Sequence, residues 1–145
     1  TVPTVFIAIP TLNRPEFVRH AVQSVRDQTF QDWRILLSDN ASRSDCAESV
    51  KAYVDGLQDP RIGYWRQPKN IREYGNCCWL FEQCREPYFM VLHDDDQLEP
   101  EPGAQLILEL APAPAVTRGP NVTIVGAGTT SATSIVFTTR RKWLR

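Results

Sequence analysis

Apolar runs alternate with amphipathic segments along the first 92 residues of the chain. Four runs are rich in β-branched and aromatic side chains, and they span residues 4–9, 33–38, 61–66 and 87–92. The first and the last are almost continuously apolar, which is typical of strands buried on both faces of a parallel sheet. Three intervening segments carry apolar side chains at helical spacing, and they span residues 15–28, 45–57 and 73–84.

This order of strands and helices predicts an α/β fold with a mainly parallel sheet, because right-handed crossovers through helices link parallel strands. The pattern changes after residue 96, where five prolines interrupt residues 100–120. There the sequence predicts one helix at 103–110 and two short strands at 121–125 and 133–139.

Short polar loops follow three of the predicted strands, at residues 10–14, 39–42 and 93–99. In open parallel sheets, ligands bind outside the carboxyl ends of the strands. We therefore expect these three loops to converge on one crevice.

The third loop begins with His93 and three consecutive aspartates, Asp94, Asp95 and Asp96. Adjacent carboxylates about 4 Å apart repel by roughly 4 kcal/mol at an effective dielectric constant near 20. A bound Mg²⁺ or Mn²⁺ offsets that repulsion and usually completes its shell with water and substrate phosphates. The cluster predicts metal-assisted binding of a nucleotide diphosphate, and the alternative is that the aspartates are solvated and cap the following turn.

Several other phosphate and hydrolytic chemistries lack their motifs in this chain. No glycine-rich run ends in Gly-Lys-Ser/Thr, and no G-x-G-x-x-G follows the first strand. The first strand also ends without an acid, which argues against phosphoaspartyl enzymes and receiver domains. No Ser-His-Asp arrangement is legible, because the two histidines are His20, expected to be partly exposed on a helix, and His93.

Composition and charge limit the kinds of protein and partner that this chain can represent. A chain of 145 residues with 42% hydrophobic side chains can bury one sizeable core. No apolar run approaches the roughly 20 residues of a membrane span, and we expect neither a span nor a secretory signal. The net charge of −1 gives no strongly basic face, so nucleic acid is not an expected partner.

Four cysteines lack the paired spacing of a zinc site and are too few for a disulfide scaffold of this length. They favour a reducing, cytoplasmic location. Cys77 and Cys84 would share one helical face, and core packing is favoured for them over a metal-ligand pair.

Ordered segments across about 100 residues resemble family 2 glycosyltransferases of GT-A fold. The segments are VFIAIPTLNR at 5–14, SVRDQTF at 24–30, WRILLSDNAS at 33–42, RIGY at 61–64, Asn70, Asn76 and YFMVLHDDDQLEP at 88–100. The runs at 121–125 and 134–142 are similar to later parts of the family. The resemblance implies a three-layer, Rossmann-like GT-A fold that is truncated at its C-terminal side.

The resemblance also implies roles for individual residues. It places Pro10, Thr11 and Asn13 beside the nucleotide base and ribose, and Asp39 as acceptor of a hydrogen bond from the base. Asp94 falls where a ribose contact would lie, and Arg72 stands where the family commonly has glycine, either reaching the base or phosphates or simply solvated.

For the metal, the resemblance favours Asp95, with Asp96 beside it. His93 departs from the family's D-x-D motif, because it stands at the first aspartate of that motif. Strand alternation instead favours Asp94 and Asp96 on one face, since successive side chains of a strand point to opposite sides. The choice between these ligand pairs stays open at this point.

The implied function is metal-dependent, inverting transfer of a sugar from a nucleotide-diphosphate donor to a hydroxyl of a glycan, lipid or protein acceptor, with Mn²⁺ or Mg²⁺ as cofactor. Residues 1–103 would bind the donor, and 104–145 would form an incomplete acceptor-side region. The catalytic base is expected beyond residue 145. The alternative is a catalytically incompetent nucleotide-binding or interaction module of the same fold.

Acidic and basic groups in the last 50 residues change this expectation little. The acids after the aspartate cluster, Glu99, Glu101 and Glu109, are expected to be exposed, so none supplies a convincing base. The basic end at 140–145 is expected to be a solvated terminus, with contact to phosphates or an anionic membrane as the alternative.

Overall fold

The computed structural model describes residues 5–28, 30–86, 88–98, 116–118, 122–125 and 134–138. Its helices are α1 (Pro15–Arg26), α2 (Ser44–Leu57) and α3 (Arg72–Glu82). Its strands are β1 (Val5–Thr11), β2 (Trp33–Asp39), β3 (Ile62–Arg66), β4 (Tyr88–Val91), β5 (Val116–Arg118), β6 (Val122–Val125) and β7 (Ser134–Thr138). The four strands and three helices predicted before residue 93 are confirmed, with no bound displaced by more than two residues.

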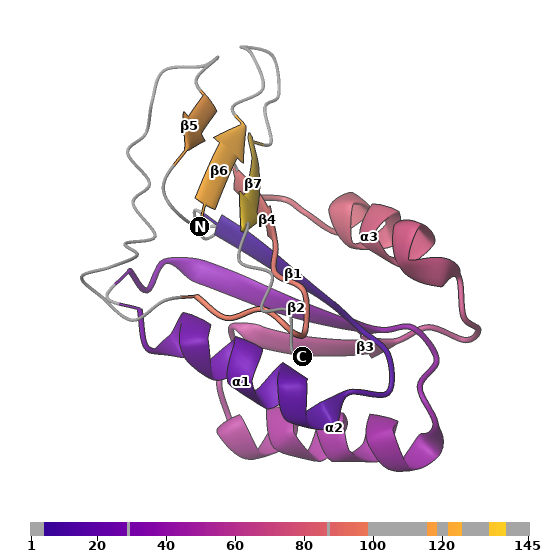
Figure 1. Cartoon of the computed structure of the whole chain (residues 1–145). Helices are drawn as coiled ribbons and strands as arrows, with labels where there is room; N and C mark the ends of the chain where they lie inside the picture. Colours follow the sequence, from indigo (N-terminus) through magenta and orange to yellow (C-terminus); the bar gives the residue numbers. More distant parts are fainter. Residues whose placement is uncertain are drawn as a thin grey trace, which may run out of the picture.

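The strands form one sheet in the order β3-β2-β1-β4-β7-β6-β5. The pairs formed among β1 to β4 are parallel, and so is the pair of β4 with β7. Strand β6 is antiparallel to both of its neighbours, β7 and β5. Strand β1 lies inside the sheet, with β2 on one side and β4 on the other, as Figure 1 shows. The predicted α/β fold with a mainly parallel sheet is confirmed.

Both faces of β1 are buried, and its alternate side chains pack into two different apolar clusters, one on each face of the sheet. Val5, Ile7 and Ile9 join a core cluster with the apolar faces of α1 and α2. Phe6 and Ala8 join a second cluster on the opposite face, where α3 packs. The helices therefore cover the sheet from two sides, α1 and α2 on one and α3 on the other (Figure 1), which explains why this strand carries no polar residue until its last position.

Helix α1 shows how the sequence sets one of these layers. Pro15 occupies the first turn, where its missing N–H is not needed for helix hydrogen bonds. Val18, Ala21, Val22 and Val25 are buried at a spacing of three and four residues, which places them on one stripe facing the sheet. In the described part of the chain, no helix is both long enough and apolar enough to cross a membrane.

The later strands extend the same sheet. The two strands expected at 121–125 and 133–139 are found as β6 and β7, and β5 was not expected. Strand β7 pairs in parallel with β4, so that Met90 lies opposite Val136. The helix predicted at 103–110, the three late glutamates and the basic residues 140–145 lie outside the described residues.

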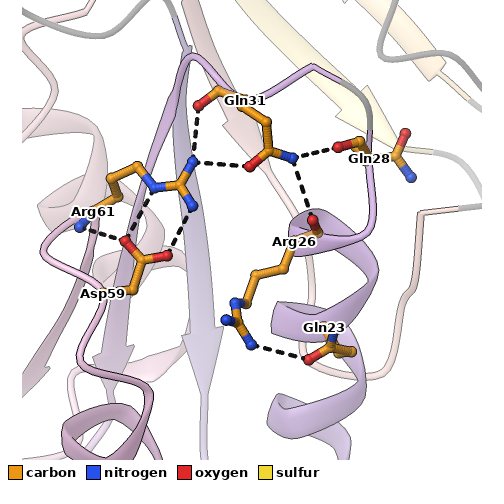
Figure 2. Close-up of polar contacts among 6 residues, drawn as sticks. All are labelled: Gln23, Arg26, Gln28, Gln31, Asp59 and Arg61. Carbon is orange, nitrogen blue, oxygen red and sulfur yellow. Dashed lines mark hydrogen bonds and ion pairs between the residues drawn. The ribbon is translucent and has the colours of Figure 1, made fainter.

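A polar network ties the sheet to α1 at the amino ends of the strands (Figure 2). Arg61 donates two guanidinium hydrogen bonds to Asp59 and two more to the backbone and side-chain oxygens of Gln31. The Gln31 amide donates in turn to the backbone oxygens of Arg26 and Gln28. The hydrogen bond from Arg61 holds the pKa of Asp59 below its usual range. These hydrogen bonds link the segments before β2 and β3 to the end of α1 and so brace this side of the sheet.

A second ion pair fastens β2 to the segment before β4. Arg34 Nε lies 2.6 Å from Glu86 Oε1, and the Glu86 side chain is only 1% exposed. Burial alone would raise the pKa of Glu86, but the Arg34 hydrogen bonds and the backbone N–H of Arg85 bring it below its usual range. The Arg34 guanidinium also lies 4.4 Å from the centroid of the Phe6 ring.

We expect Arg34→Met to lower the free energy of unfolding by about 2–3 kcal/mol at pH 7, because it leaves the Glu86 carboxylate buried without its cation. In the wild-type protein the lowered pKa of Glu86 contributes stability above the usual glutamate pKa, and that contribution is lost as the pH falls through the folded-state pKa. The difference between variant and wild type should therefore shrink below about pH 4. Urea unfolding at pH 7 and pH 3.5 measures it.

The matched control is Lys51→Met, which removes the same charge from an exposed pair, because Lys51 and Asp55 lie 2.8 Å apart with about 60% of each side chain exposed. Its cost should stay near 0.5 kcal/mol or less. Equal effects of the two substitutions would show that the buried Arg34–Glu86 pair contributes no more to the free energy of unfolding than an exposed pair does.

Candidate functional site

A cavity of about 640 Å³ opens at the carboxyl ends of β1, β2 and β4. Its walls come from the three loops expected to converge there and from the start of α3. The lining residues are Pro10, Thr11, Leu12, Arg14, Asn40, Asn70, Arg72, Glu73, Asn76, His93, Asp94, Asp95 and Asp96. The predicted crevice is thus present, and α3 adds a wall to it.

The aspartates stand on a tight turn directly after β4. The backbone N–H of Asp96 donates to the carbonyl of His93 at 2.9 Å, so the backbone leaves extended geometry at once. Asp94 and Asp96 are buried, whereas Asp95 is exposed. After the turn, the N–H of Leu98 donates to the Ser24 hydroxyl on α1, which fixes the segment against that helix.

Asp94 is held by groups from the loop after β1. The Thr11 hydroxyl donates to Asp94 Oδ2 at 2.9 Å, and Arg14 Nη1 lies 3.4 Å from Asp94 Oδ1. Burial raises the pKa of Asp94, and the Thr11 hydrogen bond and the Arg14 charge offset part of that rise. The carboxylate is ready to accept further hydrogen bonds, but its charge is costly in this position.

Arg14 lies between two of the carboxylates. The same Nη1 atom that reaches Asp94 is 3.5 Å from Asp95 Oδ2. The carboxylates of Asp94 and Asp95 therefore converge on one point, which the Arg14 guanidinium occupies. Their oxygen atoms are the ligands that Mg²⁺ and Mn²⁺ prefer, so the donor set fits such an ion.

Within the described ranges, no group of three or more histidine, cysteine or acid side chains is arranged to hold a metal ion. An ion bound by Asp95 and a neighbour would therefore need ligands from water or substrate. Mg²⁺ sites at phosphate-binding centres commonly have this composition.

Hydrogen bonds cross-link the loops around the cavity. Asn13 donates its backbone N–H to the Ser42 hydroxyl and accepts from the Arg43 N–H through its side chain, both at 2.8 Å. Asn40 accepts from the Ile71 N–H and donates to the Asn70 side chain. The loops after β1, β2 and β3 thus form one connected rim.

Asp39 sits beneath this rim and is fully buried. Its carboxylate accepts from the Ser42 N–H and from the Tyr64 hydroxyl, each at 2.7 Å. Burial raises the pKa of Tyr64 well above its usual value, and the Asp39 hydrogen bond raises it further.

Backbone strain is concentrated at the same edge of the sheet. Four non-glycine residues have positive φ among the described residues, and three of them, Asn13, Ala41 and Arg72, lie in these loops or at the start of α3. The fourth, Gln58, ends α2. Such conformations cost about 1–3 kcal/mol each and cluster at functional sites.

The cavity gathers most, but not all, of the residues predicted for a site. Pro10, Thr11, Arg72, Asp94, Asp95 and Asp96 line it, whereas Asn13 and Asp39 are not among the lining residues. His93 also lines it and lies 3.5 Å from Glu73. Arg14 and Asn40 also line the cavity but were not predicted as site residues. Their positions in the predicted loops 10–14 and 39–42 were the sequence signal that could have identified them.

The histidine and cysteines to which the sequence analysis gave no functional role, His20, Cys77 and Cys84, do not line the cavity. His20 is exposed on α1, and Cys84 packs against the core cluster of Phe6 and Leu80. Cys77 is half-buried, and burial raises the pKa of its thiol.

Comparison with known proteins gives a consistent result. The sequence pattern of the family described as Glycosyl transferase family 2 matches residues 6–136. A candidate colanic acid biosynthesis glycosyl transferase, WcaA of Escherichia coli strain K12, is 30% identical over 102 residues, which cover 68% of this chain. The GalNAc(5)-diNAcBac-PP-undecaprenol beta-1,3-glucosyltransferase of Campylobacter jejuni is 32% identical over 100 residues, which cover 66% of this chain. The matched parts span only 34% and 31% of these two relatives.

Solved structures share the fold. S. aureus TarS matches with a TM-score of 0.59 at 15% identity, over 68% of this chain and 29% of that chain. The mannosyltransferase PcManGT of Pyrobaculum calidifontis, solved in complex with GDP-Man and Mn²⁺, matches with a TM-score of 0.60 at 12% identity, over 68% of this chain and 29% of that chain. At these identities the likeness concerns the fold.

We expect Asp94→Asn to stabilise the fold at pH 7 by on the order of 1 kcal/mol, because the amide keeps an oxygen for the Thr11 hydroxyl and removes a buried charge. The raised pKa of Asp94 means that wild-type stability falls as the pH rises through that pKa, and the variant does not share this loss. The gain should therefore disappear as the pH falls below the usual aspartate pKa of about 3.9. Thermal unfolding at pH 7 and pH 3 measures both effects.

Asp55→Asn is the control, since that carboxylate is 63% exposed. It should change stability by no more than about 0.5 kcal/mol at either pH. A clear loss of stability in Asp94→Asn at pH 7 would show that the Arg14 ion pair outweighs the cost of burial.

Proposed function

The chain belongs to glycosyl transferase family 2, and from this membership we propose that its cavity binds the nucleotide diphosphate of a sugar donor through Mn²⁺ or Mg²⁺. The observation that carries the proposal is the charge of the cavity wall. Two arginines, Arg14 and Arg72, face four acids, Glu73 and the three aspartates. A diphosphate would meet net repulsion there, and a divalent cation would cancel the excess negative charge of the wall.

We assign the metal to Asp95, with Asp96 as its neighbour in the same turn. Asp95 is the exposed member of the cluster, so its oxygens are open to an incoming ion, whereas Asp94 is already engaged by Thr11. A bound cation would stabilise the negative charge of the departing diphosphate.

Asp94, Thr11 and Pro10 are assigned to the ribose side of the donor. The support is that they lie together on the cavity wall at the ends of β1 and β4. Asn13 and Asp39 are assigned to the base by way of the rim that they brace. Each Asp39 oxygen accepts one hydrogen bond, from Ser42 or Tyr64, and keeps a further lone pair. Direct contact with the base would require the fully buried carboxylate to become accessible.

The proposed reaction is transfer of the sugar to a hydroxyl of a glycan, lipid or protein acceptor, with inversion. On this proposal residues 1–103 serve the donor and residues 104–145 contribute to the acceptor side. The general base must lie within hydrogen-bond reach of the acceptor hydroxyl, beside the bound donor sugar, and we assign it to none of the cavity residues named above.

Calorimetric titration of the 145-residue chain with UDP, GDP, ADP and CDP, each with Mn²⁺ and with EDTA, tests the donor site. We expect at least one nucleotide to bind, with an affinity at least about tenfold lower in EDTA, because the charge balance of the cavity then opposes the diphosphate. Asp95→Asn should lower the affinity in Mn²⁺ to the EDTA level.

Asp55→Asn removes an equal charge outside the cavity and should leave this binding unchanged. Tight binding that survives both EDTA and Asp95→Asn would remove the metal from the proposal. Binding of no nucleotide would favour a degenerate or interaction module of the same fold.

Arg72 offers a second test of the site, because its backbone holds a φ of 65°, where glycine is favoured. We expect Arg72→Gly to leave the free energy of unfolding within about 1 kcal/mol of wild type, since relief of strain offsets the added chain entropy. The same substitution should weaken nucleotide binding about tenfold, the loss typical of one charge-assisted hydrogen bond.

Gln58→Gly is the matched control, because Gln58 has a φ of 50° at the end of α2 and does not line the cavity. It should change stability in the same way and leave nucleotide binding intact. Unchanged binding in Arg72→Gly would show that the Arg72 side chain is merely solvated.

A further inference from the structure

We propose that Arg14 is an internal counter-cation of the metal site, which occupies the acidic turn in the absence of ligand and yields it when the divalent cation binds. This inference rests on the proposed function and deepens it. It starts from one nitrogen atom, Arg14 Nη1, that lies 3.4 Å from Asp94 and 3.5 Å from Asp95.

The position of Arg14 has an electrostatic reason. Asp94 is 9% exposed at its side chain and Asp95 is its immediate neighbour, so their like charges would raise the energy of the ligand-free turn. A single guanidinium shared between them lowers that energy. Of the two arginines that line the cavity, only Arg14 lies within ion-pair distance of these aspartates.

Arg14 is also able to leave. Its side chain is 50% exposed, and both ion-pair distances are long compared with the 2.7–2.9 Å of a tight charge-assisted hydrogen bond. By contrast, Arg34 lies 2.6 Å from its buried glutamate. The backbone of Arg14 is fixed as the residue before Pro15 at the start of α1, so movement falls to the long side chain.

Two cations cannot share Asp95 without mutual repulsion. A divalent ion that binds this carboxylate therefore competes with Arg14, and the displaced guanidinium remains in the cavity where the diphosphate is proposed to bind. Removing Arg14 should have effects of opposite sign: tighter binding of the metal alone and weaker binding of the nucleotide diphosphate.

The test is titration of the nucleotide-free 145-residue chain with Mn²⁺, with free Mn²⁺ followed by electron paramagnetic resonance. Arg14→Met and Arg14→Gln should bind Mn²⁺ about five- to tenfold more tightly than wild type. With saturating Mn²⁺, the same variants should bind UDP or GDP, whichever the wild type binds better, about tenfold more weakly. Circular dichroism checks that each variant is folded, and the two different replacements guard against a packing effect of either.

Arg19→Met is the matched control, because it removes the same charge from α1, the helix that Arg14 precedes, and Arg19 contacts Ser49 and Glu16 rather than the aspartates. It should leave both affinities within about twofold of wild type. An equal gain in Mn²⁺ affinity from Arg19→Met would reduce the effect to net charge and overturn the inference.

Failure of this inference is distinguishable from failure of the proposed function. Nucleotide binding by the wild type that depends on Mn²⁺, together with unchanged Mn²⁺ affinity in both Arg14 variants, overturns the inference alone. Mn²⁺ binding by neither wild type nor variants, with or without nucleotide, overturns it together with the metal site.

Discussion

Ala8 lies opposite Val91 in the parallel ladder between β1 and β4, and this register determines where the site can be. Three residues further along the chain stand Thr11, at the end of β1, and Asp94, in the turn after β4, and they meet in a hydrogen bond of 2.9 Å. A shift of one residue would turn the core-facing side chains of β1 to the wrong layer, because both of its faces are buried. Packing of the two apolar clusters therefore fixes the register that brings Thr11 and Asp94 together, although neither residue is part of a cluster.

The two edges of the sheet use polar residues differently. At the amino ends of the strands, the Arg61 guanidinium donates to the Asp59 carboxylate and to Gln31 (Figure 2). At the carboxyl ends, acids outnumber arginines and a half-exposed guanidinium serves two carboxylates. The first arrangement braces the fold, whereas the second leaves charge to be balanced by a ligand.

The sequence was sufficient to predict the strands and helices before residue 93, because their periodicities and apolar runs are unambiguous. It was insufficient for β5 and for the continuation of the sheet through β7, since pairing between β4 and β7 joins residues more than 40 positions apart and leaves no local pattern. Asn13 and Asp39 were expected beside the nucleotide, and in the structure they do not line the cavity but form hydrogen bonds within and between the loops around it. Side-chain direction in a loop depends on such partners, which sequence alone does not specify.

Arg14 and Arg72 both line the cavity. In sequence, each is a charged residue at the start of a helix, a position that usually indicates solvent. In the structure, Arg72 has a strained backbone and Arg14 lies against carboxylates that are costly to leave unpaired. On the proposed function, contact with an anion would offset the backbone strain at Arg72, and a divalent cation would take over the charge that Arg14 supplies to the two aspartates. A nucleotide and a metal bound as proposed would both rearrange groups of this one cavity, so the binding of one would be coupled to the binding of the other.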